Sequence, residues 1–298
     1  MDWLLCMVMI TGLLAVGFVG SLSWALSLYR TLLNTRKEHV HEEFVLRRER
    51  QDVGRDFVAN ASHELRTPIT IIKGFLETMR DMPEISQDLF DEILNKMVKS
   101  CQRMESLVKN LLLLADLENC PKGGFEECDL ITLVDELSYN LITLHQEATI
   151  ETYFKDSSIQ VWANLDLIEL AIRNLLENAV KYSKGAARIV IRLEAGDTTC
   201  KIRILDEGMG IPEKDLPHLF DRFYTVDKTH SRRLGGAGLG LSIVKKIVEN
   251  HRGTISVSSK HQEWTEFVLE LPLASHLSLE DMYAAYREPQ AAAESPSR

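Results

Sequence analysis

The segment from residue 58 to residue 79 reads VANASHELRTPITIIKGFLETM, and it decides the fold of the amino-terminal half. Its apolar residues recur at intervals of seven, which is typical of a helix that packs against other helices along one seam. The seam residues are Val58, Leu65, Ile72 and Met79, with Ala61, Pro68 and Phe75 at the companion spacing. In this register His63 falls on the side opposite the seam, so we expect its imidazole to face solvent.

A second helix with the same repeat follows after Pro83, and Ser86 can cap its first turn. Its seam residues are Phe90, Met97, Met104 and Leu111, with Ile93, Ser100, Leu107 and Leu114 between them. Two antiparallel helices with one apolar seam each form a hairpin that leaves an apolar face uncovered. Pairing two hairpins into a four-helix bundle buries that face, so the pattern predicts a homodimer.

The residues from Trp3 to Tyr29 include no charged side chain. About 20 apolar residues span the hydrocarbon core of a bilayer as a helix, so this stretch predicts a transmembrane anchor. A cleaved signal peptide would open with a basic segment, whereas Asp2 is the charged side chain ahead of this stretch. Arginines and lysines follow from Arg30 onward, so the positive-inside rule predicts a single-pass protein of the inner (cytoplasmic) membrane with everything after Tyr29 in the cytoplasm.

Composition narrows the class of protein. The 298 residues leave room for about two domains. The formal net charge of -10 argues against nucleic acid as a partner, because a net-negative surface repels phosphates. The five cysteines have no C-x-x-C spacing, which fits incidental thiols better than a disulfide framework or a zinc site.

The second half alternates helical and strand patterns, which predicts an α/β sandwich. Helices are expected over 130–146, 164–182 and 239–250, and strands over 148–154, 188–194, 199–205, 254–259 and 265–271. The predicted organisation is a multi-domain chain with a transmembrane anchor over 1–29, a helical linker over 30–52, a hairpin domain over 53–118, a linker over 119–129, an α/β domain over 130–274 and a tail over 275–298.

Three motifs in the α/β part place glycine or polar residues where a ligand could bind. Gly236-Ala237-Gly238-Leu239-Gly240 leads into a helix whose free N–H groups could receive an anion. Asp206-x-Gly208-x-Gly210 follows a strand, and its carboxylate could accept a hydrogen bond from an exocyclic amine. Asn174 and Asn178 share one helical face, and amide oxygens are suitable ligands for Mg²⁺. Taken alone, each motif is equally consistent with an ordinary turn, helix start or polar helix face.

Taken together and in this order, the motifs resemble those of a bacterial sensor histidine kinase, most closely of the phosphate-sensor type. The resemblance covers about residues 50–273. The matching segments are the phosphoacceptor box Phe57–Pro68, the asparagine box Asn174–Tyr182, the first glycine box Asp206–Gly210, the phenylalanine box Leu219–Tyr224 and the second glycine box Gly236–Leu241. The family implies a dimerisation and phosphotransfer hairpin followed by an ATP-binding α/β sandwich of the Bergerat type.

The resemblance implies a role for each matching residue. His63 would receive the γ-phosphoryl group of ATP, Glu64 would orient or deprotonate the imidazole, and Thr67 would position water for dephosphorylation of a partner. Asn178 would hold Mg²⁺, with Asn174 assisting. The other implied nucleotide contacts are Lys181 at phosphate, Tyr182 over the adenine, Asp206 at the adenine amino group, and Gly208, Gly210, Gly236, Gly238, Leu239 and Gly240 in the glycine boxes.

The chain departs from the family at Thr225, where related sequences usually have an arginine directly after the tyrosine of the phenylalanine box. The contact with the γ-phosphate would then fall to Arg222, Lys228 or Arg232. These residues belong to a stretch over 211–235 that the resemblance identifies as a mobile lid.

The predicted function is that of a membrane-anchored, homodimeric, ATP-dependent protein-histidine kinase of a two-component system. It would use ATP and Mg²⁺, phosphorylate His63, pass the phosphoryl group to an aspartate of a response regulator, and dephosphorylate that regulator. The alternative is a nucleotide-binding, non-catalytic signalling scaffold with a degenerate lid, which Thr225 favours. A third class is an ATPase of the gyrase and chaperone type, which shares only the nucleotide-binding fold.

Overall fold

The computed structural model describes residues 57–82, 85–118, 124–227 and 236–283. The predicted anchor over 1–29 and the linker over 30–52 lie outside these residues. Among the helices that the structure describes, none is both long and apolar enough to cross a membrane.

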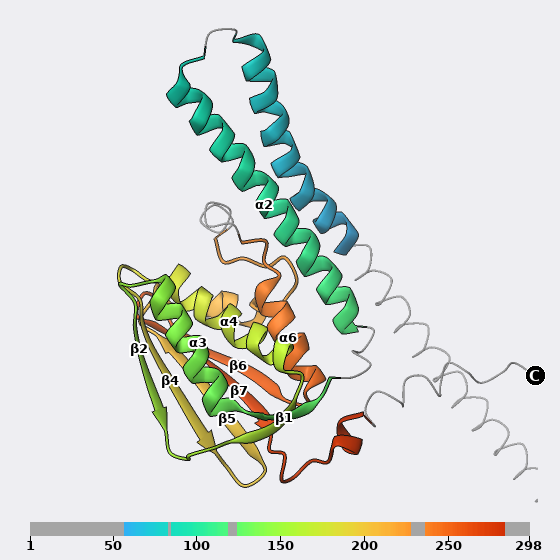
Figure 1. Cartoon of the computed structure of the whole chain (residues 1–298), viewed down its shortest axis with the longest axis vertical. Coiled ribbons are helices and arrows are strands. Elements are labelled where there is room, and N and C mark those ends of the chain that lie inside the picture. The colour runs from blue at the N-terminus through green and yellow to red at the C-terminus, as the bar shows by residue number, and fades with distance from the viewer. Residues whose placement is uncertain (1–56, 83–84, 119–123, 228–235, 284–298) are drawn as a thin grey trace, which may run out of the picture. The chain divides into compact units, whose positions relative to one another are not determined.

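The first part of the chain is a helical hairpin, formed by a helix over residues 57–81 and by α2, Gln87–Glu118 (Figure 1). The Ser86 hydroxyl accepts a hydrogen bond from the Leu89 N–H at 3.4 Å, as expected of a residue that caps a helix. Three seam residues of α2 are buried, Ile93, Leu107 and Leu114, with 4%, 3% and 2% of their surface exposed. The heptad prediction is therefore confirmed at these three positions, whereas Met97, Met104 and Leu111 are half-buried and Phe90 is 37% exposed.

The first helix follows the predicted seam less closely. Pro68 is buried and Leu65 and Ile72 are half-buried, but Val58 is 63% exposed. A single hairpin covers each seam residue from one side only, so a seam position near its open end keeps contact with solvent. The sequence pattern identifies the face correctly but overestimates the burial of Val58.

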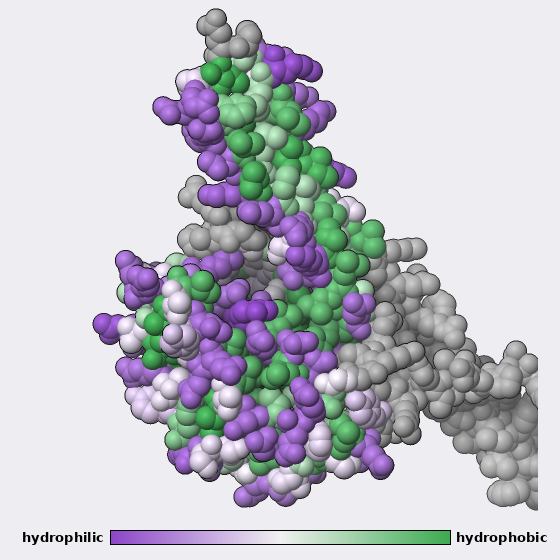
Figure 2. Space-filling model, viewed as in Figure 1, coloured by the Kyte–Doolittle hydropathy of each residue, from purple (hydrophilic) through white to green (hydrophobic). Residues whose placement is uncertain are grey.

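A second apolar row, which the sequence analysis did not separate from the seam, remains exposed on the hairpin. Figure 2 shows this apolar surface along the helices. Counted on the heptads of each helix, the row occupies positions e and b, next to seam position a. Its members are Ile69, Leu76, Leu94, Val98, Val108 and Leu112, all of them between 42% and 62% exposed. The hairpin thus has the uncovered apolar face that the sequence predicts.

The second part is an α/β domain built on a five-stranded sheet with the order β2-β4-β5-β7-β6 (Figure 1). The strands are β2 Thr149–Phe154, β4 Arg188–Ala195, β5 Thr199–Asp206, β6 Thr254–Lys260 and β7 Trp264–Pro272. β2 pairs with β4 in parallel, whereas β4–β5, β5–β7 and β6–β7 are antiparallel. Alternate residues of β4 and β5 are buried, as expected of strands that cover a core with one face.

Helices cover one face of this sheet (Figure 1). They are α3 Leu130–Leu144, α4 Leu165–Lys181 and α6 Gly240–Asn250. Each buries an apolar stripe at helical spacing, which in α4 consists of Ile168, Ala171, Ile172, Leu175, Leu176 and Ala179. The two layers confirm the predicted α/β sandwich. A short 3-10 helix, η1, Glu213–His218, follows β5 in the chain.

Two short strands were not predicted. β1, Glu126–Asp129, pairs antiparallel with β3, Gln160–Ala163, in a separate two-stranded sheet. Each strand has four residues and β1 begins with two glutamates, so neither shows a clear alternation of apolar and polar residues. The range 119–129, which the sequence analysis assigns to a linker, therefore contains a strand that is paired within the α/β domain.

A buried histidine joins two helices of the domain. His251 is 1% exposed, and its Nε2 accepts a hydrogen bond from the Asn164 N–H at 3.0 Å. Its Nδ1 therefore carries the proton and donates to the Ile247 carbonyl at 2.7 Å. Burial lowers the pKa of His251 from 6.5 to about 4, so the ring is neutral near pH 7. Because Asn164 caps α4, this histidine fixes the beginning of α4 against the end of α6.

Candidate functional site

The phosphoacceptor box lies within the helix over residues 57–81. His63 is exposed, as the heptad register predicts. Glu64 and Thr67 are half-buried on the same helix. The three side chains thus come from two successive helical turns, with the nucleophile candidate on the solvent side.

The Glu64 carboxylate forms an ion pair with a residue that the sequence analysis did not single out. Arg103 of α2 places its Nη2 at 3.3 Å from Glu64 Oε2, and the side chains are 18% and 19% exposed, respectively. The same nitrogen lies 3.5 Å from the carbonyl oxygen of Gly236. A lone arginine in a charged helix gives no signal in the sequence, which is why this contact was missed.

A buried carboxylate marks the end of β5. Asp206 is 6% exposed, and its Oδ1 accepts a hydrogen bond from the Gly208 N–H at 2.9 Å. Burial raises the pKa of Asp206 from 3.8 to about 6, and the hydrogen bond from Gly208 acts in the opposite direction. A buried carboxyl group whose pKa is strongly shifted is typical of a functional position.

The turn after Asp206 is packed so closely that two of its glycines have no room for a side chain. A Cβ at Gly208 would lie 2.5 Å from Asp206 Oδ1 and 2.7 Å from the Tyr182 carbonyl oxygen. Gly210 has a φ of 59°, and a Cβ there would collide with the Lys260 carbonyl. The Met209 N–H donates to the Tyr182 carbonyl at 3.0 Å, so the first glycine box lies against the carboxyl end of α4.

The asparagine box faces the second glycine box. Asn174 and Asn178 are half-buried and lie four residues apart on α4. A Cβ added at Gly240, the first residue of α6, would be 3.7 Å from Asn174 Oδ1. At the end of α4, the Lys181 Nζ lies 5.3 Å from the centre of the Tyr182 ring. The helix α4 therefore brings both glycine boxes and the asparagine box together.

The second glycine box is tied to the phenylalanine box. Gly238 has a φ of 72°, and the Phe223 N–H donates to its carbonyl at 2.8 Å. Leu239 is 1% exposed and is the residue before α6. The first N–H groups of a helix have no intrahelical acceptor, and the apolar side chain of Leu239 provides none. Lys228 and Arg232, two of the candidates for a phosphate contact, lie outside the described residues.

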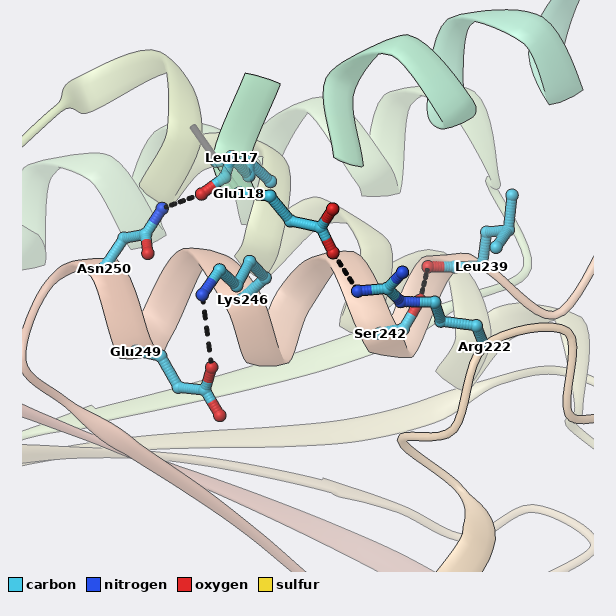
Figure 3. Close-up of polar contacts among 8 residues, drawn as sticks. All are labelled: Leu117, Glu118, Arg222, Leu239, Ser242, Lys246, Glu249 and Asn250. Atoms are coloured by element: carbon cyan, nitrogen blue, oxygen red, sulfur yellow. Dashed lines mark hydrogen bonds and ion pairs between the residues drawn. The ribbon is translucent and has the colours of Figure 1, made fainter. Parts of the chain in front are cut away.

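Arg222, the remaining candidate, is placed differently from the expectation. Its guanidinium forms an ion pair with Glu118 at the end of α2 (Figure 3). Nearby, the Asn250 side-chain amide donates to the Leu117 carbonyl at 2.9 Å. Leu117 is near the carboxyl end of α2, where helix carbonyls lack intrahelical partners, so Asn250 caps α2 from α6. Arg222 contacts a carboxylate here, and a nucleotide phosphate would have to compete with Glu118 for it.

The phenylalanine box also has an anchor that the sequence analysis did not assign. The Tyr224 hydroxyl donates to Asp215 Oδ1 at 2.6 Å, and Asp215 is 8% exposed in η1. This hydrogen bond, together with burial, raises the pKa of Tyr224 to about 12. Thr225 follows this anchor directly and is half-buried.

The donor set suits the two cofactors that the sequence predicts. Among the described residues no three His, Cys, Asp or Glu side chains gather as a metal site. The amide oxygens of Asn174 and Asn178 are neutral hard ligands, and Mg²⁺ is commonly held by few protein ligands together with substrate phosphates. The uncapped start of α6 suits an anion, and Asp206 suits a purine amino group.

Two family models match the chain, one over the hairpin and one over the α/β domain. The phosphoacceptor domain of histidine kinases matches residues 55–120, and the ATPase domain described as histidine kinase-, DNA gyrase B- and HSP90-like matches residues 163–275. Together they cover more than half of the chain. This chain is a member of the sensor histidine kinase family.

Curated relatives of this histidine kinase are themselves sensor kinases. ArlS of Staphylococcus epidermidis is 38% identical over 220 residues, which cover 74% of this chain and 48% of ArlS. The phosphate regulon sensor PhoR of Haemophilus influenzae is 31% identical, covering 72% of this chain and 51% of PhoR. The identity to PhoR is lower than that to ArlS, so these matches do not single out the phosphate-sensor type. The histidine kinase spans about half the length of these curated relatives.

Solved structures of histidine kinases share the fold. AdeS of Acinetobacter baumannii superposes with a TM-score of 0.56 at 28% identity, covering 71% of this chain and 98% of the AdeS chain. ThkA, in its complex with the response regulator TrrA, superposes with a TM-score of 0.62 at 26% identity, covering 76% of this chain and 64% of the ThkA chain. Both similarities include more than the α/β domain, because each covers over two thirds of this chain.

Proposed function

We propose that this chain is a membrane-anchored, homodimeric kinase that phosphorylates its own His63 from Mg-ATP and passes the phosphoryl group to an aspartate of a response regulator. One observation supports the proposal more strongly than the others. The same chain presents an exposed histidine on a helical hairpin and, in a separate α/β domain, a buried carboxylate between glycines beside an asparagine-bearing helix.

The proposed nucleotide site follows from the convergence of motifs on α4. Asp206 accepts a hydrogen bond from the adenine amino group, and the absence of side chains at Gly208 and Gly210 lets the turn pack closely against Tyr182 and Lys260 and so hold Asp206 in place. Tyr182 covers the base, and Lys181 and the start of α6 attract the phosphates. Asn178, assisted by Asn174, would hold Mg²⁺, which supplies positive charge at the phosphates.

In the proposed reaction the unprotonated imidazole nitrogen of His63 attacks the γ-phosphorus. A P–N bond forms, the bond from the γ-phosphorus to the bridging oxygen breaks, and ADP leaves with the electron pair. Phosphoryl transfer requires mainly positioning and neutralisation of charge, which this donor set can provide. Glu64 orients the ring or takes its proton, and Thr67, one turn further along the helix, positions water when the regulator is dephosphorylated.

The proposed homodimer rests on the exposed apolar row of the hairpin. Six residues from both helices leave large apolar side chains in contact with solvent. Monomeric proteins rarely expose a long apolar row, and a second copy of the same hairpin offers a matching surface. The family model over residues 55–120 describes a phosphoacceptor domain in the same part of the chain.

Two further elements of the proposal come from the sequence and the relatives. The uncharged stretch from Trp3 to Tyr29 supports an anchor in the inner (cytoplasmic) membrane, with the catalytic part in the cytoplasm. The solved complex of ThkA with TrrA supports a response regulator as the partner. The net charge of -10 gives no support for nucleic acid as a partner.

The test is incubation of the detergent-solubilised full chain with γ-labelled ATP and Mg²⁺. We expect an acid-labile, alkali-stable label that is absent in His63→Gln and retained in His218→Gln, an exposed histidine of η1 that serves as the control. Nucleotide binding without label would support the signalling scaffold that Thr225 favours. Release of phosphate at the same rate in wild type and His63→Gln would support a gyrase- or chaperone-type ATPase instead.

A further inference from the structure

The ion pair between Glu64 and Arg103 differs from the other ion pairs of the hairpin. Lys73–Glu77, Lys96–Glu92 and Lys109–Glu105 each join residues four apart on one helix, and their side chains are more than half exposed. Such surface pairs contribute little. Glu64 and Arg103 instead join two helices across 39 positions of sequence, and less than a fifth of each side chain is exposed.

The heptad register explains why these two residues meet. Both fall at position g, next to the buried seam, and in an antiparallel pair of helices the g flanks face each other. The exposed apolar row occupies positions e and b, on the other flank of the seam. The ion pair therefore lies on the side of the hairpin that the proposed dimer contact does not use.

Arg103 has a second acceptor in the nucleotide-site loop. Its Nη2 is 3.3 Å from Glu64 Oε2 and 3.5 Å from the carbonyl oxygen of Gly236. Gly236 is the first residue of the second glycine box. A guanidinium has five N–H donors in a fixed planar arrangement, so one arginine can hold both acceptors at once. A lysine could supply the charge but not this geometry.

We propose that Arg103 is a positioning residue: its guanidinium fixes the carboxylate next to the phosphoacceptor histidine and links that carboxylate to the second glycine box. The inference rests on the proposed function. Arg103 acts on the reaction through Glu64, so its loss lowers the rate of transfer to His63 and leaves the affinity for ATP nearly unchanged.

The experiment measures the initial rate of His63 labelling in the full chain at increasing ATP concentrations. We expect Arg103→Gln to lower the rate at saturating ATP by about tenfold or more, since small misplacements of a reacting group have effects of this size, and to change KM for ATP by less than about twofold. Arg103→Lys should recover part of the rate. The matched control is Lys109→Gln, an exposed cation of α2 with a partner on its own helix, which should label like wild type.

A double-mutant cycle separates positioning from a merely structural role. If Arg103 works through Glu64, then Arg103→Gln should cost less than about twofold further rate in a Glu64→Gln background. Losses that multiply would overturn the inference, and so would a rise in KM with an unchanged saturated rate, which would make Arg103 a nucleotide ligand.

Folding and the proposed function are checked on the same samples. Circular dichroism and affinity for a fluorescent ATP analogue should be the same for wild type, Arg103→Gln and Lys109→Gln. If Arg103→Gln does not fold, Arg103→Lys carries the test, and a wild-type rate for it would overturn the need for a planar donor. Absence of label in wild type would defeat the proposed function, whereas a labelled wild type with an equally fast Arg103→Gln would defeat this inference alone.

Discussion

The hairpin and the α/β domain bury their apolar residues to very different extents. In the domain, the apolar stripe of α4 and the inward residues of β4 are almost completely covered, with Ile168, Ile172 and Ile191 at 0% exposed. In the hairpin, residues such as Leu76 and Leu112 keep 53% and 62% of their surface in solvent. The core of the α/β domain is closed by its own sheet and helices together with the end of α2, whereas the hairpin keeps an apolar row in contact with solvent. In the proposed dimer a second hairpin covers that row.

The largest effect is expected when the exposed apolar row of the hairpin is made polar. Leu94→Glu together with Val98→Glu should raise the dissociation constant of the proposed dimer about a hundredfold or more, because two apolar side chains per copy would be replaced by charges that must be desolvated. Analytical ultracentrifugation measures the change. The α/β domain of the double variant should still bind nucleotide, and Lys99→Glu, an exposed residue of α2 at heptad position c and outside the row, serves as the control.

The stability of the α/β domain should fall at acidic pH because of the buried residue His251. The pKa of this histidine is lowered in the folded state from 6.5 to about 4, so the unfolded chain binds the proton first as the pH falls. Stability is fully present above pH 6.5 and is lost down to about pH 4, by about 3 kcal/mol in total.

Asp206 changes stability in the opposite direction, because its pKa is raised from 3.8 to about 6. The contribution of His251 is therefore measured as the difference in unfolding free energy between wild type and His251→Gln. The cost of His251→Gln in urea unfolding should be largest near pH 7 and shrink by about 3 kcal/mol towards pH 4. A cost that is independent of pH would mean that folding does not lower the pKa of the ring.

Nucleotide affinity should depend on the same carboxylate. If Asp206 accepts a hydrogen bond from the base, binding requires its ionised form, and with a pKa of about 6 this form falls about tenfold between pH 7 and pH 5. Titration with a fluorescent ATP analogue at several pH values measures the slope. Asp206→Asn should bind weakly with a flatter profile, since the remaining slope then comes from the phosphates and other groups. Equal slopes would remove Asp206 from the site.

The smallest effect is expected where the two parts contact each other. Arg222 is paired with Glu118 of α2, and the side chains are 31% and 44% exposed, so the pair is worth at most about 1 kcal/mol. Glu118→Gln should release Arg222 for the nucleotide phosphates and lower KM for ATP by about twofold to fivefold. Labelling kinetics show this, and an unchanged KM would exclude Arg222 as a phosphate contact.

The sequence predicts the elements that have long periodic patterns. The heptads gave the hairpin and the solvent-facing His63, and the 3.6-residue period gave α4 with its two asparagines. β1 and β3 were missed because four residues do not establish an alternation. The contacts of Arg103, Asn250 and His251 were missed for another reason. Each joins positions that are far apart in sequence, and the type of residue alone does not say where its partner lies.

The amide of Asn250 on the last turns of α2 has a practical consequence for dividing this protein into fragments. Leu114 and Leu117 are each 2% exposed, and the end of α2 packs on α6. A fragment that starts after Glu118 would bare the α6 surface under these leucines and lose the hydrogen bond from the Asn250 amide to the Leu117 carbonyl. A fragment intended to contain the ATP-binding domain should therefore begin before Leu114, and not in the glycine-containing linker further along the chain.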